Sequence, residues 1–163
     1  MKPLTYTTIN ELSVQDFPEH DVVYLAREIA QRRLAVLNAP ALISPTTVHE
    51  YLQAIVGDLQ HEEFHAVWMN NRHRPLAHER LFTGDIDSCT VFPRQVARSA
   101  LEHMASAVLF FHNHPSQELE PSEADVAITL KLQDVLRLLD VRVLDHLIVS
   151  VKGFTSLREE GLL

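Results

Sequence analysis

An apolar run that ends in two histidines constrains this chain more than any other feature. Residues 107–111 read Ala-Val-Leu-Phe-Phe, the longest β-like stretch in the sequence, and His112-Asn113-His114-Pro115 follow directly. Side chains alternate with period 2 along a strand, so the two histidines point to the same side. We therefore predict a buried strand whose end presents two imidazoles to one metal ion.

Asp125 supplies a third candidate ligand, because ten residues separate it from His114. Two histidines and one carboxylate leave the fourth position of a tetrahedral zinc ion for water, which is the arrangement of hydrolytic rather than structural zinc. The sequence also allows a second role for Asp125. Ser122-Glu123-Ala124-Asp125 precedes a helical pattern and has the form of a capping box. The spacing leaves both roles open.

Helix and strand signals alternate along the chain, which predicts an α/β fold with a mixed sheet flanked by helices. With 163 residues, 46% of them hydrophobic, the chain has the size of one domain. We expect an extension with one helix over residues 1–43 and a metal-binding domain over residues 44–163. Inside the domain the pattern predicts helices over 45–59, 93–104 and 122–139, and strands over 64–69, 76–83, 107–111 and 141–151.

Charge and cysteine content limit the possible partners. The net charge of -8 argues against a broad phosphate-binding surface, so we do not expect nucleic acid as a partner. No apolar run approaches the ~20 residues that span a bilayer, and the first residues lack the apolar core of a signal peptide. Cys89 is the single cysteine and excludes an intrachain disulfide. We expect a cytoplasmic protein that acts on a protein or peptide; the sequence predicts no oligomeric state.

A second metal-like string lies upstream. His61-Glu62-Glu63-Phe64-His65 satisfies H-E-x-x-H, which on a helix forms the zinc site of a zincin. The string passes straight into the β-rich residues 64–69, where strand geometry sets His61 and His65 about 13 Å apart at ~3.3 Å per residue. We therefore interpret it as a coincidence in a chain with ten histidines.

The residues around the two histidines resemble the JAMM (MPN-plus) metalloprotease family. The family pattern is H-x-H-P, six residues, S, two residues and D, and it is met by His112, His114, Pro115, Ser122 and Asp125. The closer resemblance is to the RadC-like branch, and it covers roughly residues 45–163. It implies a JAMM/MPN-type mixed sheet flanked by helices, preceded here by a helical extension, and zinc-dependent hydrolysis of a peptide or isopeptide bond.

The resemblance also implies roles for further residues. The family's Glu-x-Phe lead-in fits Glu62, which becomes the candidate general base, with Glu63 as the reserve. Ser122 matches the serine that donates a hydrogen bond to the developing oxyanion, and its alternative role is the helix cap. His146 fits a residue that supports the metal ligands, and its alternative role is that of a core histidine.

Three residues depart from the family pattern. Gln117 replaces the glycine that follows HNHPS, which questions the loop conformation that glycine permits. Phe92 and Gln95 replace a histidine and a glutamate around the Pro-Arg pair, so no role is carried over to them. Two alternatives to the hydrolase therefore stay open: a non-catalytic zinc-binding interaction module of the same fold, and a DNA-repair-associated factor, which the charge disfavours.

Overall fold

A computed structural model gives the structure of residues 45–84 and 90–163. The predicted extension over residues 1–43, with its single helix, and Cys89 lie outside the described residues. The described part contains three helices and five strands. In chain order they are α3 (Pro45–Val56), β1 (Glu63–Met69), β2 (Pro75–Thr83), α4 (Pro93–Glu102), β3 (Ala107–Asn113), α5 (Glu123–Arg137), β4 (Arg142–Ser150) and β5 (Gly153–Ser156).

The five strands form one mixed sheet in the order β2-β1-β3-β4-β5. β1 pairs antiparallel with both β2 and β3, and β4 pairs antiparallel with β5. β3 and β4 run parallel, joined by a crossover that contains α5. This arrangement makes β3 the central strand, and all seven of its residues are buried.

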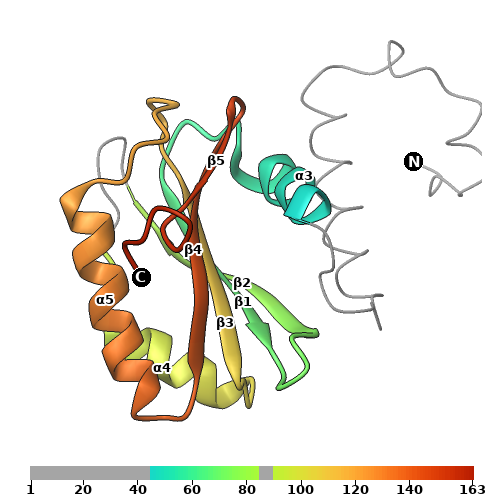
Figure 1. Cartoon of the computed structure of the whole chain (residues 1–163), viewed down its shortest axis with the longest axis vertical. Coiled ribbons are helices and arrows are strands. Elements are labelled where there is room, and N and C mark those ends of the chain that lie inside the picture. Colours follow the sequence, from blue (N-terminus) through green and yellow to red (C-terminus); the bar gives the residue numbers. More distant parts are fainter. Residues whose placement is uncertain (1–44, 85–89) are drawn as a thin grey trace, which may run out of the picture.

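Helices cover both faces of the sheet (Figure 1), and each face has its own apolar core. On one face α3 packs over alternate residues of β1 and β3, among them Val67, Leu109 and Phe111. On the other face α4 and α5 cover the intervening residues, such as Ala66 and Phe110. Successive side chains of the central strands therefore point alternately toward α3 and toward α4 and α5. The α/β fold with a mixed sheet is confirmed.

The elements predicted within residues 45–163 are present and differ from the prediction mainly at helix ends, and β5 follows beyond the predicted strand over 141–151. α3 ends at Val56 rather than at residue 59: the Gly57 N–H still makes a helical bond, to the Gln53 carbonyl at 2.9 Å, but the Leu59 N–H bonds to the Val56 carbonyl at 3.3 Å in a turn. Leu59 continues the apolar pattern because it packs on the α3-side core from the loop that follows. Among the described helices, none is long and apolar enough to cross a membrane.

Candidate metal centre

Three potential metal ligands meet at the carboxyl end of β3. His112 and His114 lie at the end of that strand, and Asp125 lies in the first turn of α5. The two histidine Nε2 atoms are 2.9 Å apart; Asp125 Oδ1 lies 3.2 Å from His112 Nε2, and Asp125 Oδ2 lies 3.4 Å from His114 Nε2. Zinc bonds of about 2.0–2.1 Å at tetrahedral angles set ligand atoms about 3.3 Å apart. The triangle therefore has the size that zinc requires.

No other part of the described structure offers such a group. Among residues 45–84 and 90–163, this is the single set of three or more His, Cys, Asp or Glu side chains whose ligand atoms all lie within 4.8 Å of one another. His112 is fully buried, whereas the side chains of His114 and Asp125 are 17% and 13% exposed. The site is thus closed on the strand side and open toward the loop that carries His114.

Hydrogen bonds leave the Nε2 atom of each histidine free to bind a cation. His114 Nδ1 lies 3.0 Å from the Glu118 carbonyl, which only accepts, so the hydrogen of this ring is on Nδ1. His112 Nδ1 lies 2.8 Å from His146 Nε2, and His146 Nδ1 lies 2.6 Å from Thr129 Oγ1. Thr129 donates its own hydrogen to the Asp125 carbonyl at 2.5 Å, so it accepts from His146.

This chain of donors fixes the hydrogen of His112 on Nδ1 as well. The Nε2 lone pairs of His112 and His114 therefore face each other beside a carboxylate. When these Nε2 atoms carry protons instead, their contacts with Asp125 hold the pKa of its carboxyl group well below the usual range, although burial acts to raise it. Two lone pairs and a negative charge within 3.4 Å repel one another unless a cation lies between them. The donor set fits zinc.

Asp125 forms the helix cap and is also placed for the second role that its sequence position allowed, that of a metal ligand. Its Oδ2 accepts hydrogen bonds from the Ser122 backbone N–H at 2.8 Å and from Ser122 Oγ at 2.6 Å, while Ser122 Oγ accepts from the Asp125 N–H at 3.1 Å. These bonds form the predicted capping box of α5. The cap holds the Asp125 carboxylate toward the histidines. The hydroxyl proton of Ser122 points to Asp125, and a role as oxyanion donor stays a prediction.

Glu62 lies next to this triangle. It precedes β1 and is partly buried, and its carbonyl accepts a hydrogen bond from the Gly84 N–H at 2.8 Å. Burial raises the pKa of Glu62 above its ordinary value; His112 and His114 act to lower it, and Asp125 acts to raise it. The carboxyl group is therefore within electrostatic reach of all three ligands, which favours Glu62 over Glu63 as the candidate general base.

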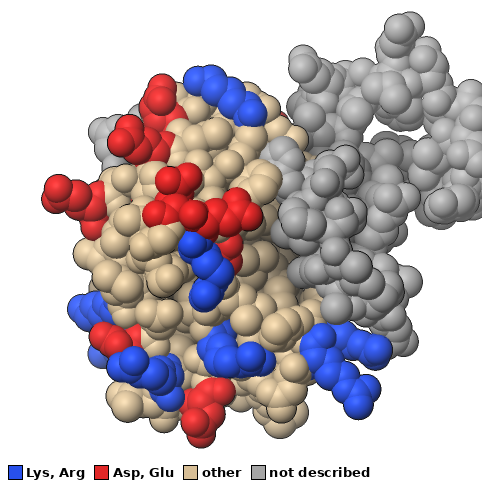
Figure 2. All heavy atoms as spheres, in the orientation of Figure 1, with Lys and Arg blue, Asp and Glu red and all other residues tan. Residues whose placement is uncertain are grey.

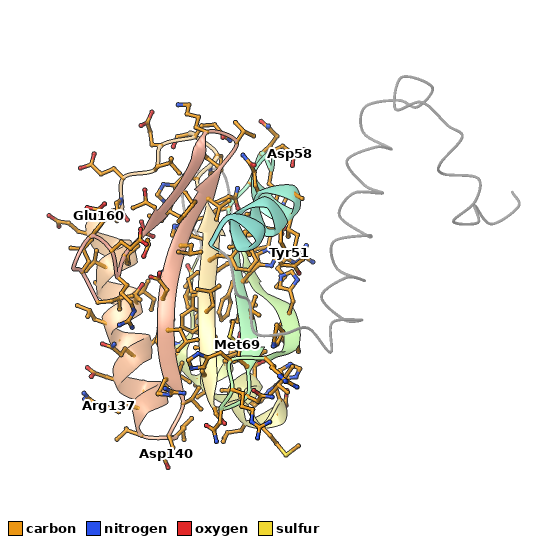
Figure 3. All side chains as sticks on the ribbon, turned by 45° about the vertical axis from the view of Figure 1, so that its right-hand side comes forward. Tyr51, Asp58, Met69, Arg137, Asp140 and Glu160 are labelled. Carbon is orange, nitrogen blue, oxygen red and sulfur yellow. The ribbon has the colours of Figure 1, made fainter. Side chains whose placement is uncertain are left out.

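Glu63 points to the opposite face of the sheet and has other partners. Its carboxylate is 2.9 Å from His61 Nε2, from His65 Nε2 and from Arg80 Nη1. The bond pattern continues through His65 Nδ1 to His78 Nε2 at 2.9 Å, and from His78 Nδ1 to the Tyr51 hydroxyl at 2.9 Å. Tyr51 lies where α3 approaches the sheet (Figure 3). We call these four residues, Tyr51, His78, His65 and Glu63, the α3-side polar chain.

The H-E-x-x-H string is not a helical zinc site. Glu63 begins strand β1, as the sequence predicts, so the helix that a zincin requires is absent from this segment. His61 precedes the strand, and both imidazoles turn to the same Glu63 carboxylate, which brings them closer together than extended spacing implies.

Gln117 keeps the loop conformation that glycine would permit. Its φ is 63°, in the left-handed region. Its side chain donates to the Gly57 carbonyl at 3.3 Å and accepts from the Val151 N–H at 3.0 Å. Gln117 therefore ties the metal loop to the end of α3 and to the β4–β5 turn, and this departure from the family pattern leaves the loop in place.

Two residues near the site were not identified from the sequence. Thr129 stands four positions after Asp125, one helical turn away, and that spacing was the available signal. Asn113 was identified only as part of the histidine motif. The available signal was its polar side chain between the two histidines on a buried strand, because buried polar groups are hydrogen-bonded. His146 is both buried and bonded to His112, so its two predicted roles coincide.

Comparison with known proteins finds similarity to one family. The family model described as RadC-like JAB domain matches residues 42–162. A UPF0758 protein of Marinobacter nauticus is 42% identical over 146 residues, which cover 86% of this chain and 64% of that protein. Similar proteins of Pseudomonas fluorescens and Cellvibrio japonicus are 47% and 48% identical, and the matches cover 82% and 75% of this chain. The matches cover only 61% and 54% of those two relatives.

Proposed function

The chain belongs to the RadC-like JAB domain family, and on that premise we propose that it is a zinc-dependent hydrolase that cleaves a peptide or isopeptide bond. The observation that carries the proposal is the triangle of His112, His114 and Asp125 with Glu62 beside it. Three protein ligands leave one position for water, as hydrolytic zinc sites do.

The protein's own residues divide the work of this reaction. His112, His114 and Asp125 would hold the zinc, which lowers the pKa of water toward ~7. Glu62 takes the proton of the attacking water and later gives it to the leaving nitrogen. A carboxyl group whose pKa is raised by burial suits both steps, because it gains and loses a proton closer to neutral pH.

We propose a protein or peptide as the substrate rather than nucleic acid. On the face shown in Figure 2, Lys and Arg side chains are scattered among Asp and Glu and form no continuous basic surface. The whole chain has a net charge of -8. Affinity for nucleic acid rests mainly on clustered cations, so this distribution supports the hydrolase over the DNA-repair alternative.

Metal content is the first test of the proposal. Elemental analysis of the wild type should find one zinc per chain, and His114→Ala should lose it. His65→Ala is the matched control, because His65 is a buried histidine on the opposite face of the sheet and should leave the zinc bound. Full retention of zinc in His114→Ala, or loss in His65→Ala alone, would exclude this site.

The second test separates catalysis from metal binding. Glu62→Gln keeps the size of the side chain but cannot accept a proton, so it should retain zinc and lose about 10²–10⁴-fold in the rate of hydrolysis. Peptide and isopeptide substrates followed by mass spectrometry give the readout. Glu120→Gln, an exposed change in the same loop, should leave the rate unchanged. A zinc-loaded wild type that cleaves no amide would instead favour the non-catalytic binding module.

A further inference from the structure

Asn113 is a buried amide placed between two metal ligands. It is the last residue of β3, 1% exposed, and strand alternation turns its side chain away from the face that carries His112 and His114. It cannot contact the metal. A buried primary amide is costly unless its oxygen and nitrogen both find partners, so its bonds indicate what it does.

Both partners of Asn113 are backbone groups on either side of Glu62. Asn113 Oδ1 accepts from the Glu63 N–H at 2.9 Å, and Asn113 Nδ2 donates to the His61 carbonyl at 2.9 Å. The Asn113 side chain therefore bonds to the two peptide groups that flank Glu62, the candidate general base: the one between residues 61 and 62 and the one between residues 62 and 63. The Gly84 N–H holds the Glu62 carbonyl from the β2 side at 2.8 Å. The backbone of Glu62 is therefore held from both neighbouring strands.

The side-chain bonds of Asn113 begin where the backbone pairing of β1 with β3 ends. The antiparallel pairing of β1 and β3 runs from Met69 opposite Ala107 to Phe64 opposite His112, and no further pair follows in this register. The next pair would be Glu63 opposite Asn113, and there the Asn113 side chain takes over the bonding from the backbone. In this register Glu62 stands opposite His114. The bonds of the Asn113 side chain therefore continue the pairing of β1 and β3 past Phe64, so that Glu62 lies opposite His114.

We propose that Asn113 is a positioning residue that holds the backbone at residues 61–63 so that the Glu62 carboxylate faces the metal site. The inference rests on the proposed role of Glu62 in the hydrolase. It explains why an amide, with a donor and an acceptor on one planar group, stands between the two histidines: it binds an N–H and a carbonyl two residues apart.

Amide hydrogen exchange tests these bonds of Asn113 without any substrate. Asn113→Ala, and Asn113→Ser as a second, polar variant, should raise exchange at the Glu63 amide by at least ~10-fold while the amides of residues 66–68 keep their protection, because only the end of the strand opens. The matched control is Asn70→Ala. Asn70 also makes two side-chain bonds to backbone, to the N–H groups of Arg72 and Arg74, but at the other end of β1.

A second readout reports the position of Glu62 relative to the metal. In protein loaded with Co²⁺ in place of zinc, Glu62 side-chain resonances should be strongly broadened by the paramagnetic ion in the wild type and in Asn70→Ala. They should be less broadened in both Asn113 variants, whose affinity for Co²⁺ should stay within about threefold of the wild type, since no ligand changes. Unchanged exchange at Glu63 together with unchanged broadening of Glu62 overturns the proposal.

Kinetics completes the test where hydrolysis is observed. Asn113→Ala should lower kcat about 10-fold or more with little change in KM, since misplacing a reacting group by ~1 Å costs up to about 10²-fold. In the Glu62→Gln background the same change should cost nothing further, because its effect passes through Glu62. An equal loss in both backgrounds contradicts the proposal. A wild type that binds metal but hydrolyses nothing refutes the hydrolase, and the exchange and broadening results still decide whether Asn113 positions Glu62.

Discussion

At the scale of single residues, the two histidine ligands are oriented by different partners. His114 is oriented by a backbone carbonyl in the metal loop, whereas His112 is oriented by a buried chain of His146 and Thr129 that returns to the Asp125 backbone. The chain couples two ligands that are 13 positions apart in the sequence, because Asp125 begins the helix on which Thr129 sits. His146 is therefore placed to orient His112 in the proposed metal site.

Replacement of His146 should weaken zinc binding. His146→Leu replaces the imidazole by an apolar side chain of similar volume and so removes the acceptor of the His112 Nδ1 hydrogen, which is then buried without a partner. Loss of such a support typically costs 10–100-fold in metal affinity, and we expect a drop in this range, with a smaller one for Thr129→Val. Competition with a chromophoric chelator measures it. His103→Leu, which removes a partner of Glu79 on α4's side of the sheet, is the control; equal affinity in all variants would show that His146 only fills the core.

The sequence predicted the grouping of the three candidate ligands better than the contacts that orient them. His112, His114 and Asp125 follow from one short pattern, because alternation along a strand and a helix start fix where these side chains point. Asn113 and Thr129 act through hydrogen bonds to backbone groups, and those depend on strand register. A single sequence does not determine register until the sheet is assembled, so these two roles required the structure.

At the scale of elements, the start of α5 serves both the helix and the metal site. The Ser122 hydroxyl accepts the Asp125 N–H and donates to the Asp125 carboxylate. The sequence predicted this capping box, and it also predicted the beginning of the helix closely. It extended the helix to residue 139, whereas α5 ends at Arg137 and Leu138 is 84% exposed. Helix ends depend on local bonding and are less determined by periodicity than helix starts with a cap.

Two substitutions of Ser122 separate the cap from an oxyanion role. Ser122→Ala should lower the free energy of unfolding by ~1 kcal/mol, whereas Ser122→Gly should lower it by only a few tenths, because glycine is tolerated at the N-cap. Both variants lack the hydroxyl. If the hydroxyl binds the oxyanion, both variants should lose the same factor in kcat. If it only caps α5, the loss in kcat should be larger for Ser122→Ala, which destabilises the helix start that places Asp125, than for Ser122→Gly. Denaturant unfolding and hydrolysis rates measured on the same samples distinguish the two, and equal stability of both variants and wild type would contradict the cap.

At the scale of the whole molecule, the two faces of the sheet carry different polar systems. The face under α4 and α5 carries the metal ligands and Glu62, while the face under α3 carries the α3-side polar chain of Tyr51, His78, His65 and Glu63. The α/β class, the mixed sheet and the strand that delivers the ligands follow from the sequence. The polar chain does not, because its members come from α3, β1 and β2 and meet only after the sheet has formed.

The α3-side polar chain should make the protein sensitive to acid above the range in which carboxylates titrate. Burial lowers the pKa of His78 to about 3 and also lowers the pKa of His65. Both stay neutral in the folded protein, while the unfolded chain takes up protons below its ordinary histidine pKa of about 6.5. The contribution of these two neutral histidines to the free energy of unfolding is therefore fully present above pH ~6.5 and is lost as the pH falls toward ~3. Glu63, whose pKa is lowered to about 2, adds its own loss only below its ordinary value of 4.5.

Glu63 therefore contributes little between pH 6.5 and 4.5, and the difference between the wild type and His78→Phe in that window isolates the contribution of His78. Each buried neutral histidine should cost up to about 1.4 kcal/mol of unfolding free energy for every pH unit in that window. Urea unfolding of chelator-treated, metal-free protein should show this slope in the wild type, and His78→Phe should reduce it by the share of one histidine. Tyr51→Phe removes the bonded hydroxyl but keeps the imidazole, so its slope should match the wild type. Identical slopes for wild type and His78→Phe would mean that His78 accepts a proton in the folded state, and the chain would then have to rearrange, because a protonated His78 can no longer accept the Tyr51 hydrogen.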